Sequence, residues 1–366
     1  MKDQKKILFI IDHLKGGGAE IMTLNLAKKL QERGYEINII TLININNYKE
    51  KTKSFNIQSI DFPTKFVGGK LLIDKKLESS KKEQLQSLID EIRPEAVILT
   101  IWYAYLSISF INHPNIWIWS QADILPEFNK TSNPIKILRN IYKKRKFINK
   151  FKEVFSNKNF IVLNKDLKLK YSQILENSNI NVIYNGLNLK DTIQSEKKEK
   201  VWDICYVGRL SPSKQIEHAL FALKNSHIIK NMIIIGDGAR KDKLLKLVNQ
   251  LNISDRVHFT GWVDEPIEYI KKSKILVLPS QTEGFGLVIG EALLNGTHVV
   301  AYNCSEGVSH QFFTPDMQRG LVQPNNRAEL KNSIEDILEN PYQIPPNLSK
   351  RYDIKEMADK FIKLID

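Results

Sequence analysis

The stretch Pro279-Ser-Gln-Thr-Glu-Gly-Phe-Gly-Leu-Val-Ile-Gly-Glu291 determines how the second half of the chain is interpreted. An apolar run, Ile275 to Leu278, ends where this stretch begins, and a short polar loop then leads to Gly284-Phe285-Gly286. A helix-like segment starts at Leu287 and closes at Gly296. The pattern therefore predicts a strand, a tight glycine turn and the N-terminus of a helix.

Two carboxylates flank this turn, Glu283 before it and Glu291 within the helix. The N-terminus of a helix leaves backbone N–H groups unpaired and carries partial positive charge, so it suits phosphate. An ionised carboxylate only accepts hydrogen bonds, so it suits hydroxyl groups instead. Phosphate flanked by hydroxyls describes a nucleotide sugar, and we expect such a ligand here.

The whole chain has the size and composition of a globular protein with two domains. It has 366 residues, of which 42% are apolar and 26% charged. Its two cysteines, Cys205 and Cys304, lack metal-ligand spacing and are expected to be reduced and buried, as in the cytosol. The first apolar run, Ile7–Ile11, is too short for a signal sequence or a membrane helix. We therefore expect a cytoplasmic protein that does not cross a membrane.

The net charge of +13 is distributed unevenly along the chain. Residues 1–195 hold 31 Lys and Arg against 19 Asp and Glu, whereas residues 196–366 hold 23 against 22. The excess in the first half predicts an anionic partner there, such as a membrane surface, a phosphorylated acceptor or nucleic acid. A general bias toward lysine is the alternative, but such a bias should affect both halves.

Strand and helix patterns alternate along the chain and predict an α/β fold with two doubly wound, Rossmann-like domains. The first domain is expected at 1–190, where apolar strands alternate with helices and Gly16-Gly-Gly18 follows the first strand. A charged segment without apolar periodicity, 191–200, reads as a linker. The second domain is expected at 201–345, and a last helix at 352–366 is expected to dock back on the first domain.

The segment Pro134–Phe155 mixes lysine and arginine with apolar residues at helical spacing. A basic amphipathic helix of this kind can lie on an anionic membrane surface. It can equally be a core helix whose lysine face is solvated. The sequence leaves both alternatives open.

A second element of the later domain supplies positive charge for the anion. The strand ending at Val207 runs into Gly208-Arg209, and Lys214 follows a few residues later. Arg209 can grip phosphate oxygens with two hydrogen bonds, and Lys214 adds a point charge. Because parallel strands end at the same edge of a sheet, we expect both residues to face the glycine turn.

These motifs together resemble the retaining glycosyltransferases with the GT-B fold, family 4 in the usual classification. The resemblance rests on the two glutamates separated by seven residues and covers nearly the whole chain. Further matching motifs are Val207-Gly-Arg-Leu-Ser-Pro-Ser-Lys214, Gly236-Asp-Gly238, Gly16-Gly-Gly-Ala-Glu20 and Ile183-Tyr-Asn-Gly-Leu187. The resemblance implies two Rossmann-like domains that face each other across a cleft.

The resemblance also implies roles for individual residues. Arg209 and Lys214 would hold the donor diphosphate and stabilise the leaving group, and Glu283 would contact the transferred sugar. No metal or other cofactor is expected, because side chains supply the cations. The implied donor-binding residues are Gly17, Gly18, Gly208, Trp262, Val263, Gly284, Phe285, Gly286, Leu287, Val288 and Glu291.

The acceptor side departs from the family pattern. Many relatives carry a histidine after the fourth strand of the first domain, where this chain has Gln121 or Ser120. Glutamine cannot shuttle a proton, although it can position a hydroxyl group. Asp123 is a nearby carboxylate that can also be a helix N-cap, and His13 follows the first strand. We take His13, Gln121 and Asp123 as acceptor-side candidates.

The sequence thus predicts a retaining glycosyltransferase that uses a nucleotide sugar, with UDP as the nucleotide. The expected product is a hexose or N-acetylhexosamine linked to a glycolipid or lipid-linked oligosaccharide of the cell envelope, such as a lipopolysaccharide core. The expected partners include an anionic membrane surface, contacted peripherally from the cytoplasm, but no nucleic acid. A nucleotide-sugar epimerase and a non-catalytic subunit of a glycosyltransferase complex are the alternatives.

Overall fold

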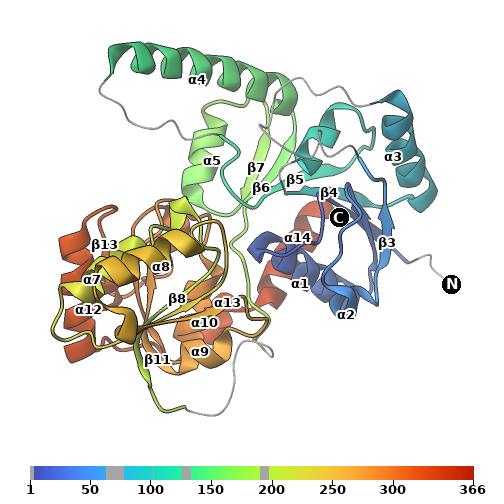
Figure 1. Ribbon diagram of the computed structural model, residues 1–366. Coiled ribbons are helices and arrows are strands. Elements are labelled where there is room, and N and C mark those ends of the chain that lie inside the picture. The colour runs from blue at the N-terminus through green and yellow to red at the C-terminus, as the bar shows by residue number, and fades with distance from the viewer. Residues whose placement is uncertain (1–3, 63–77, 102, 126–132, 190–197) are drawn as a thin grey trace. The chain divides into compact units, whose positions relative to one another are not determined.

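Two parallel β-sheets organise the chain, each with helices packed against its strands (Figure 1). The computed structural model describes residues 4–62, 78–101, 103–125, 133–189 and 198–366. The strands divide between two compact units, Met1–Tyr184 with Ile354–Asp366 and Asn185–Asp353. This architecture confirms the expected α/β class with two doubly wound sheets. The expected linker falls mostly outside the described residues, since 190–197 are not among them.

The sheet of the first unit has the strand order β3-β2-β1-β4-β5-β6-β7, with all neighbouring pairs parallel. Its central strands are buried on both faces, which explains their continuous Ile, Leu, Val and Phe runs. The strands are β1 (Lys6–Ile11), β2 (Glu36–Thr41), β3 (Asn56–Ser59), β4 (Ala96–Thr100), β5 (Ile116–Ser120), β6 (Asn159–Val162) and β7 (Asn179–Val182).

The helices of the first unit come from both ends of the chain. The last helix, α14, packs against α1 and buries Phe361, whose ring meets Trp119 edge-on at 4.9 Å between centroids. The helices are α1 (Gly18–Glu32), α2 (Lys49–Thr52), α3 (Ser79–Ile92), the 3₁₀ helix η1 (Ala104–Ser109), α4 (Pro134–Phe155), α5 (Lys165–Ser172) and α14 (Ile354–Ile365).

The sheet of the second unit has the order β10-β9-β8-β11-β12-β13, again with parallel pairing. The strand order reverses between β8 and β11, so the loops that follow these two strands leave in opposite directions. The strands are β8 (Trp202–Val207), β9 (Met232–Ile235), β10 (Val257–Gly261), β11 (Ser273–Leu278), β12 (His298–Tyr302) and β13 (Leu321–Val322).

Short helices connect the strands of the second unit and cover its sheet (Figure 1). They are η2 (Pro212–Lys214), α7 (Glu217–Lys224), α8 (Lys241–Gln250), η3 (Ser254–Arg256), α9 (Ile267–Lys271), α10 (Leu287–Leu294), α11 (Glu306–Ser309), η4 (Met317–Gly320), α12 (Arg327–Glu339) and α13 (Leu348–Tyr352). Among the described residues, no helix of either unit is both long and apolar enough to span a bilayer.

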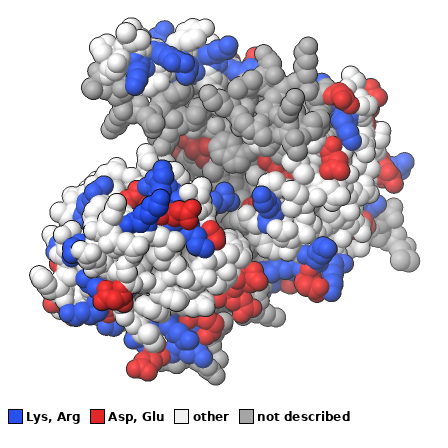
Figure 2. Space-filling view, viewed as in Figure 1, with Lys and Arg blue, Asp and Glu red and all other residues white. Residues whose placement is uncertain are grey.

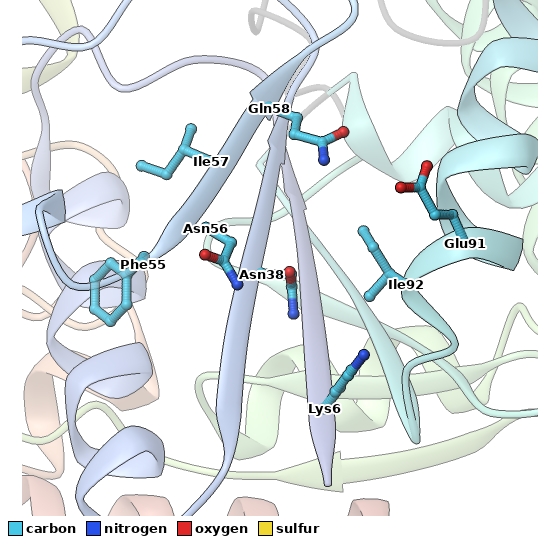
Figure 3. A pocket seen from close by; sticks show the side chains of 8 residues that line it. All are labelled: Lys6, Asn38, Phe55, Asn56, Ile57, Gln58, Glu91 and Ile92. Atoms are coloured by element: carbon cyan, nitrogen blue, oxygen red, sulfur yellow. The ribbon is translucent and has the colours of Figure 1, made fainter. Parts of the chain in front are cut away.

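An open, polar hollow of about 480 Å³ lies on the first sheet (Figure 3). Its lining comes from the amino-terminal parts of the strands, including Lys6 and Asn38, and from the end of α3 at Glu91. Ligands of doubly wound sheets bind instead at the carboxyl ends of the strands. The hollow is therefore set apart from the edge where the sequence places the candidate residues.

We predict that Phe361→Ala destabilises the first unit by about 3–5 kcal/mol, because it removes a fully buried ring from the packing of α14. Calorimetric unfolding should show a lower transition temperature for one unit only. Lys360→Ala is the matched control, because Lys360 precedes Phe361 on the same helix and its side chain is exposed. Equal melting of the two variants would contradict a structural role for α14.

Candidate functional site

The candidate site of the second unit lies at the carboxyl ends of β8 and β11, which are neighbours in the sheet. Gly208 and Arg209 follow β8 directly, and the stretch from Pro279 to Gly286 follows β11. The two loops are tied together, because the backbone N–H of Gln281 donates to the carbonyl of Ser213 at 2.8 Å. Because β8 and β11 are adjacent and parallel, their carboxyl ends bring the cationic loop and the glycine turn together, as the sequence predicts.

The glycine turn leads directly into α10. Gly286 is the N-cap of this helix and has a φ of +75°, a conformation that side chains with a Cβ rarely adopt. No side chain caps the helix, so the turn offers the backbone N–H groups of the first residues, which include Leu287 and Val288. These groups and the helix dipole favour an anion at this point.

A second segment holds the turn from behind. A Cβ added at Gly307 would lie 2.1 Å from the carbonyl oxygen of Gly284, so the two backbones are in direct contact. The side chain of Gln311 donates to the carbonyls of Phe285 at 2.5 Å and Gly307 at 3.1 Å. Tyr352 in turn donates to Gln311 at 3.2 Å. This buried network keeps the turn in one conformation.

Glycines also bring the β9 loop against the β8 loop. A Cβ at Gly236 would lie 2.0 Å from the carbonyl oxygen of Gly208, and one at Gly238 would lie 2.5 Å from that of Leu210. The hydroxyl of Tyr206 donates to the carbonyl of Arg209 at 3.1 Å. Burial, followed by the nearby charge of Glu283, raises the pKa of Tyr206, so this donor stays protonated. The backbone before the cationic side chains is therefore fixed.

The cations expected at the site have different surroundings. Lys214 forms an ion pair with Glu283 at 2.6 Å, and both side chains are largely buried, at 23% and 13% exposed. Arg209 is exposed at the sheet edge, and its guanidinium makes no ion pair with any residue that the structure describes. Its five donors remain available for an anion.

Glu291, unlike Glu283, has no charged partner among the described residues. Its residue is half-buried, and burial of the carboxyl group raises its pKa to about 7. The structure gives this carboxyl no hydrogen-bond partner among the described residues, whereas its backbone carbonyl accepts from Asn295. A carboxylate without a protein partner can accept hydrogen bonds from two hydroxyl groups of a ligand.

Trp262 and Val263 follow β10, the edge strand of the second sheet. The indole of Trp262 is 57% exposed, and its N–H lies 3.3 Å from an Asp264 oxygen. An exposed aromatic face at the carboxyl edge of a sheet is able to stack on a planar ring. Its role beside a nucleobase stays a prediction.

The first unit places its glycines and His13 after β1. Gly17 is the N-cap of α1, and its N–H donates to the hydroxyl of Tyr48 at 3.2 Å, with Gly18 opening the helix. His13 lies 3.6 Å from the buried carboxylate of Glu20. These residues share the carboxyl edge of the first sheet, the usual ligand edge of such a fold.

Gln121 and Asp123 follow β5 in the first unit and differ in availability. The side-chain amide nitrogen of Gln121 is buried and has no hydrogen-bond partner among the described residues. Asp123 pairs with Lys170 and also accepts from the backbone of Leu125 and the hydroxyl of Tyr171. Its carboxylate is therefore occupied by the fold, whereas the amide nitrogen of Gln121 is not used by the described residues.

Sequence reasoning did not find Gln311 and Tyr352, which hold the glycine turn. Neither belongs to a motif of the sequence. Burial, followed by the nearby charge of Glu283, raises the pKa of Cys304 to about 12, so this thiol is not ionised. Among the described residues, no group of histidine, cysteine and carboxylate side chains has the geometry of a metal site.

Comparison with protein families agrees with this geometry. Residues 189–361, which include the glycine turn and the cationic loop, match the model described as glycosyl transferases group 1. These residues form a group 1 glycosyltransferase domain. The match spans the second unit and part of α14.

Relatives and solved structures extend the likeness to the whole chain. An uncharacterized glycosyltransferase of Haemophilus influenzae is 28% identical over 343 residues, which are 92% of this chain and 91% of the relative. The lipopolysaccharide 1,6-galactosyltransferase of Escherichia coli K12 is 31% identical over 158 residues, 41% of this chain and 44% of that protein. The structure of HepE from Anabaena in complex with UDP is 17% identical, with a TM-score of 0.72 and 98% of both chains covered. This shared architecture is the GT-B fold.

We predict that Gly307→Ala destabilises the second unit by about 1–3 kcal/mol, because the new methyl group would overlap the Gly284 carbonyl. Urea unfolding followed by fluorescence would measure the loss. Gly296→Ala is the control, since its Cβ would meet no atom within 4 Å and only the positive φ is disturbed. A smaller effect at Gly307 than at Gly296 would contradict the proposed contact.

Glu291→Gln should stabilise the second unit in a pH-dependent manner. The folded pKa of about 7 lies above the ordinary value of 4.5, so the ionised carboxyl opposes folding as pH rises through this interval. We expect the variant to match the natural protein near pH 4.5 and to exceed it by about 2–3 kcal/mol above pH 7. Denaturant titrations at several pH values would measure this, and a gain independent of pH would exclude the burial effect.

Proposed function

We propose that this glycosyltransferase moves a hexose or N-acetylhexosamine from a UDP-sugar to a glycolipid or lipid-linked oligosaccharide of the cell envelope, with retention at the anomeric carbon. One observation carries the proposal, the anion site between β8 and β11 with carboxylates on either side. The UDP and UDP-glucose complexes of HepE and the lipopolysaccharide activity of the E. coli relative support the donor and acceptor classes.

The donor diphosphate would bind between the side chain of Arg209 and the N-terminus of α10. Lys214 would contact the same phosphates while keeping its ion pair with Glu283, which leaves the second oxygen of Glu283 for a sugar hydroxyl. Glu291 would accept from the ribose hydroxyls. These fixed charges would stabilise the negative charge that grows on the leaving diphosphate. In this proposal no metal ion is required, because protein cations neutralise the phosphates.

Transfer with retention breaks the bond between the anomeric carbon and the phosphate oxygen and forms a bond to the acceptor oxygen on the same face. The acceptor hydroxyl loses its proton, which the oxygen of the leaving phosphate can take. This route needs no separate protein base, which accords with Gln121 at the position where relatives carry histidine. The free amide of Gln121 would orient a hydroxyl group by donating to it.

The acceptor half of the proposal rests on the first unit and its charge. Most of the net charge of +13 lies before residue 196, which favours an anionic lipid surface at the cytoplasmic face of the membrane over nucleic acid. A non-catalytic subunit would have no need for Arg209, Lys214, Glu283 and Glu291 together at one sheet edge. An epimerase would need a free acid and a free base beside the sugar. In the segment that contacts the glycine turn, His310 and Glu306 pair with each other at 3.7 Å, and His310 also meets Arg351.

Calorimetric titration with a panel of nucleotide sugars, followed by transfer assays on envelope glycolipids, tests this function. We expect Arg209→Ala to weaken binding of the UDP-sugar by at least about 30-fold, since a charge-assisted double hydrogen bond is lost. Glu283→Ala should retain binding of UDP but lower transfer by about 100-fold or more. Addition of a chelator should leave transfer by the natural protein unchanged.

Lys243→Ala is the control variant, because it removes an exposed cation from α8 in the same unit. It should bind and transfer like the natural protein. Absence of binding by every nucleotide sugar would refute the donor site. Near-normal turnover by Glu283→Ala would refute the role of this carboxylate.

A further inference from the structure

The helix α4 is exposed over most of its length. Of its 22 residues, only Phe151 and Phe155, near its C-terminal end, are buried. Figure 1 shows the remaining turns extending away from the strands of the first unit. The structure thus excludes the alternative of a core helix for the first three turns, although the sequence allowed it. A solvated helix of this length needs another reason for its apolar residues.

Five large apolar side chains of α4 are open to solvent. The exposed fractions are 78% for Ile135, 68% for Leu138 and 69% for Tyr142, with Ile141 at 46% and Ile137 at 40%. Their spacing of three and four residues places them along one side of the helix, which we call the apolar stripe. Contiguous exposed apolar surface of this kind marks a site of interaction with another surface.

Only part of the apolar stripe continues the face that packs on the first unit. The packing face is formed at the other end of the helix by Phe147, Phe151 and Phe155, which repeat every four residues. At 3.6 residues per turn, Leu138 and Tyr142 lie on a different side of the helix from these phenylalanines. These two side chains therefore face away from the core, whereas Ile137 repeats the position of Phe155 five turns earlier and is exposed because the helix has left the unit there.

Most of the positive charge of α4 lies on a different side of the helix from the apolar stripe, although Arg145, seven residues after Leu138, shares the apolar side. Residues 128–152 contain no aspartate or glutamate, and Figure 2 shows Lys and Arg gathered along α4. Five of these cations repeat every three or four residues and form a basic stripe roughly opposite the apolar one. Lys150, the last of them, pairs with Glu153, whereas the other four make no ion pair with described residues. The basic stripe consists of Lys136, Arg139, Lys143, Lys146 and Lys150.

We propose that α4 docks the protein on an anionic lipid surface. The apolar stripe would enter the boundary between headgroups and acyl chains, and the long basic side chains would reach the lipid phosphates. Each cation near such a surface adds about 1 kcal/mol. The proposed function gives this contact its purpose, since a lipid-linked acceptor lies in such a surface, whereas the contact itself rests on α4 alone.

Two other occupants fit the helix less well. A second copy of α4 would bring the same unpaired cations together, so like charges would oppose the association. A nucleic acid would satisfy the charges but would leave the isoleucine, leucine and tyrosine of the apolar stripe exposed. An anionic lipid surface satisfies both stripes at once.

Co-sedimentation of the full chain with lipid vesicles tests the proposal. We expect binding to vesicles of mixed phosphatidylglycerol and phosphatidylcholine, little binding to phosphatidylcholine alone, and weakening by salt. Lys143→Gln with Lys146→Gln should weaken binding about 30-fold, the equivalent of about 2 kcal/mol for two charges. Leu138→Ser should weaken it about tenfold, because one apolar side chain no longer enters the lipid.

The helix α8 of the second unit supplies matched controls. Lys243→Gln with Lys246→Gln removes two exposed lysines at the same spacing, and Leu245→Ser removes a leucine that is 38% exposed. Both controls should bind vesicles like the natural protein. Unchanged melting temperatures would show that all variants are folded, since every altered side chain is exposed.

Equal loss of vesicle binding in the α4 and α8 variants would overturn the proposal, as would equal binding to neutral vesicles. A concentration-dependent dimer that Leu138→Ser dissolves would identify a second copy as the occupant instead. Tight binding of nucleic acid that requires Lys143 and Lys146 would identify nucleic acid as the partner of α4 instead. Vesicle binding is separable from the donor site, so its presence without transfer would refute the proposed function alone.

Discussion

Direct backbone contact around the glycine turn is the constraint on which the second unit depends. Gly307 meets the carbonyl of Gly284, and Gly236 meets that of Gly208, at distances that leave no space for a side chain. These contacts fix the loops after β8 and β11, and hydrogen bonds from Gln311 and Tyr206 complete the support. The backbone of Arg209 and the N-terminus of α10 are thus held in place before any ligand binds, which contributes to the preorganisation that electrostatic stabilisation requires.

The site contains one carboxylate that is paired with a cation and one that is not. Lys214 and Glu283 neutralise each other at 2.6 Å, so the fold tolerates their burial. Glu291 has no such partner, and burial raises its pKa to about 7. A group that costs stability when ionised is retained at binding sites when a ligand compensates for it. The unpaired amide of Gln121 in the first unit is a second polar group of this kind.

The sequence allowed the architecture to be predicted, and with it the place of Arg209, Lys214 and the glycine turn at one sheet edge, because these features follow local patterns. Apolar runs bounded by glycine located the strands, and Pro134–Phe155 begins and ends as expected because proline and the helical spacing mark it. The strand β3 was not predicted, since Asn56–Ser59 is an edge strand of four mostly polar residues. Gln311 could not be predicted either, because its role depends on a contact across 26 residues of chain. The surroundings of α4 likewise depend on packing, which periodicity alone does not reveal.

The position of α14 in the first unit has a consequence for synthesis of the protein. Its apolar side packs on α1, and Lys5 and Tyr35 bind the side chain of Asp366. A ribosome completes the rest of this unit at Tyr184 but reaches Ile354 only after making the whole second unit, about 10–35 s later at ordinary rates. During that interval the surface of α1 that α14 covers stays open on the nascent chain. Because α14 is the last element to be made, a chaperone can reach this surface until synthesis of the chain ends.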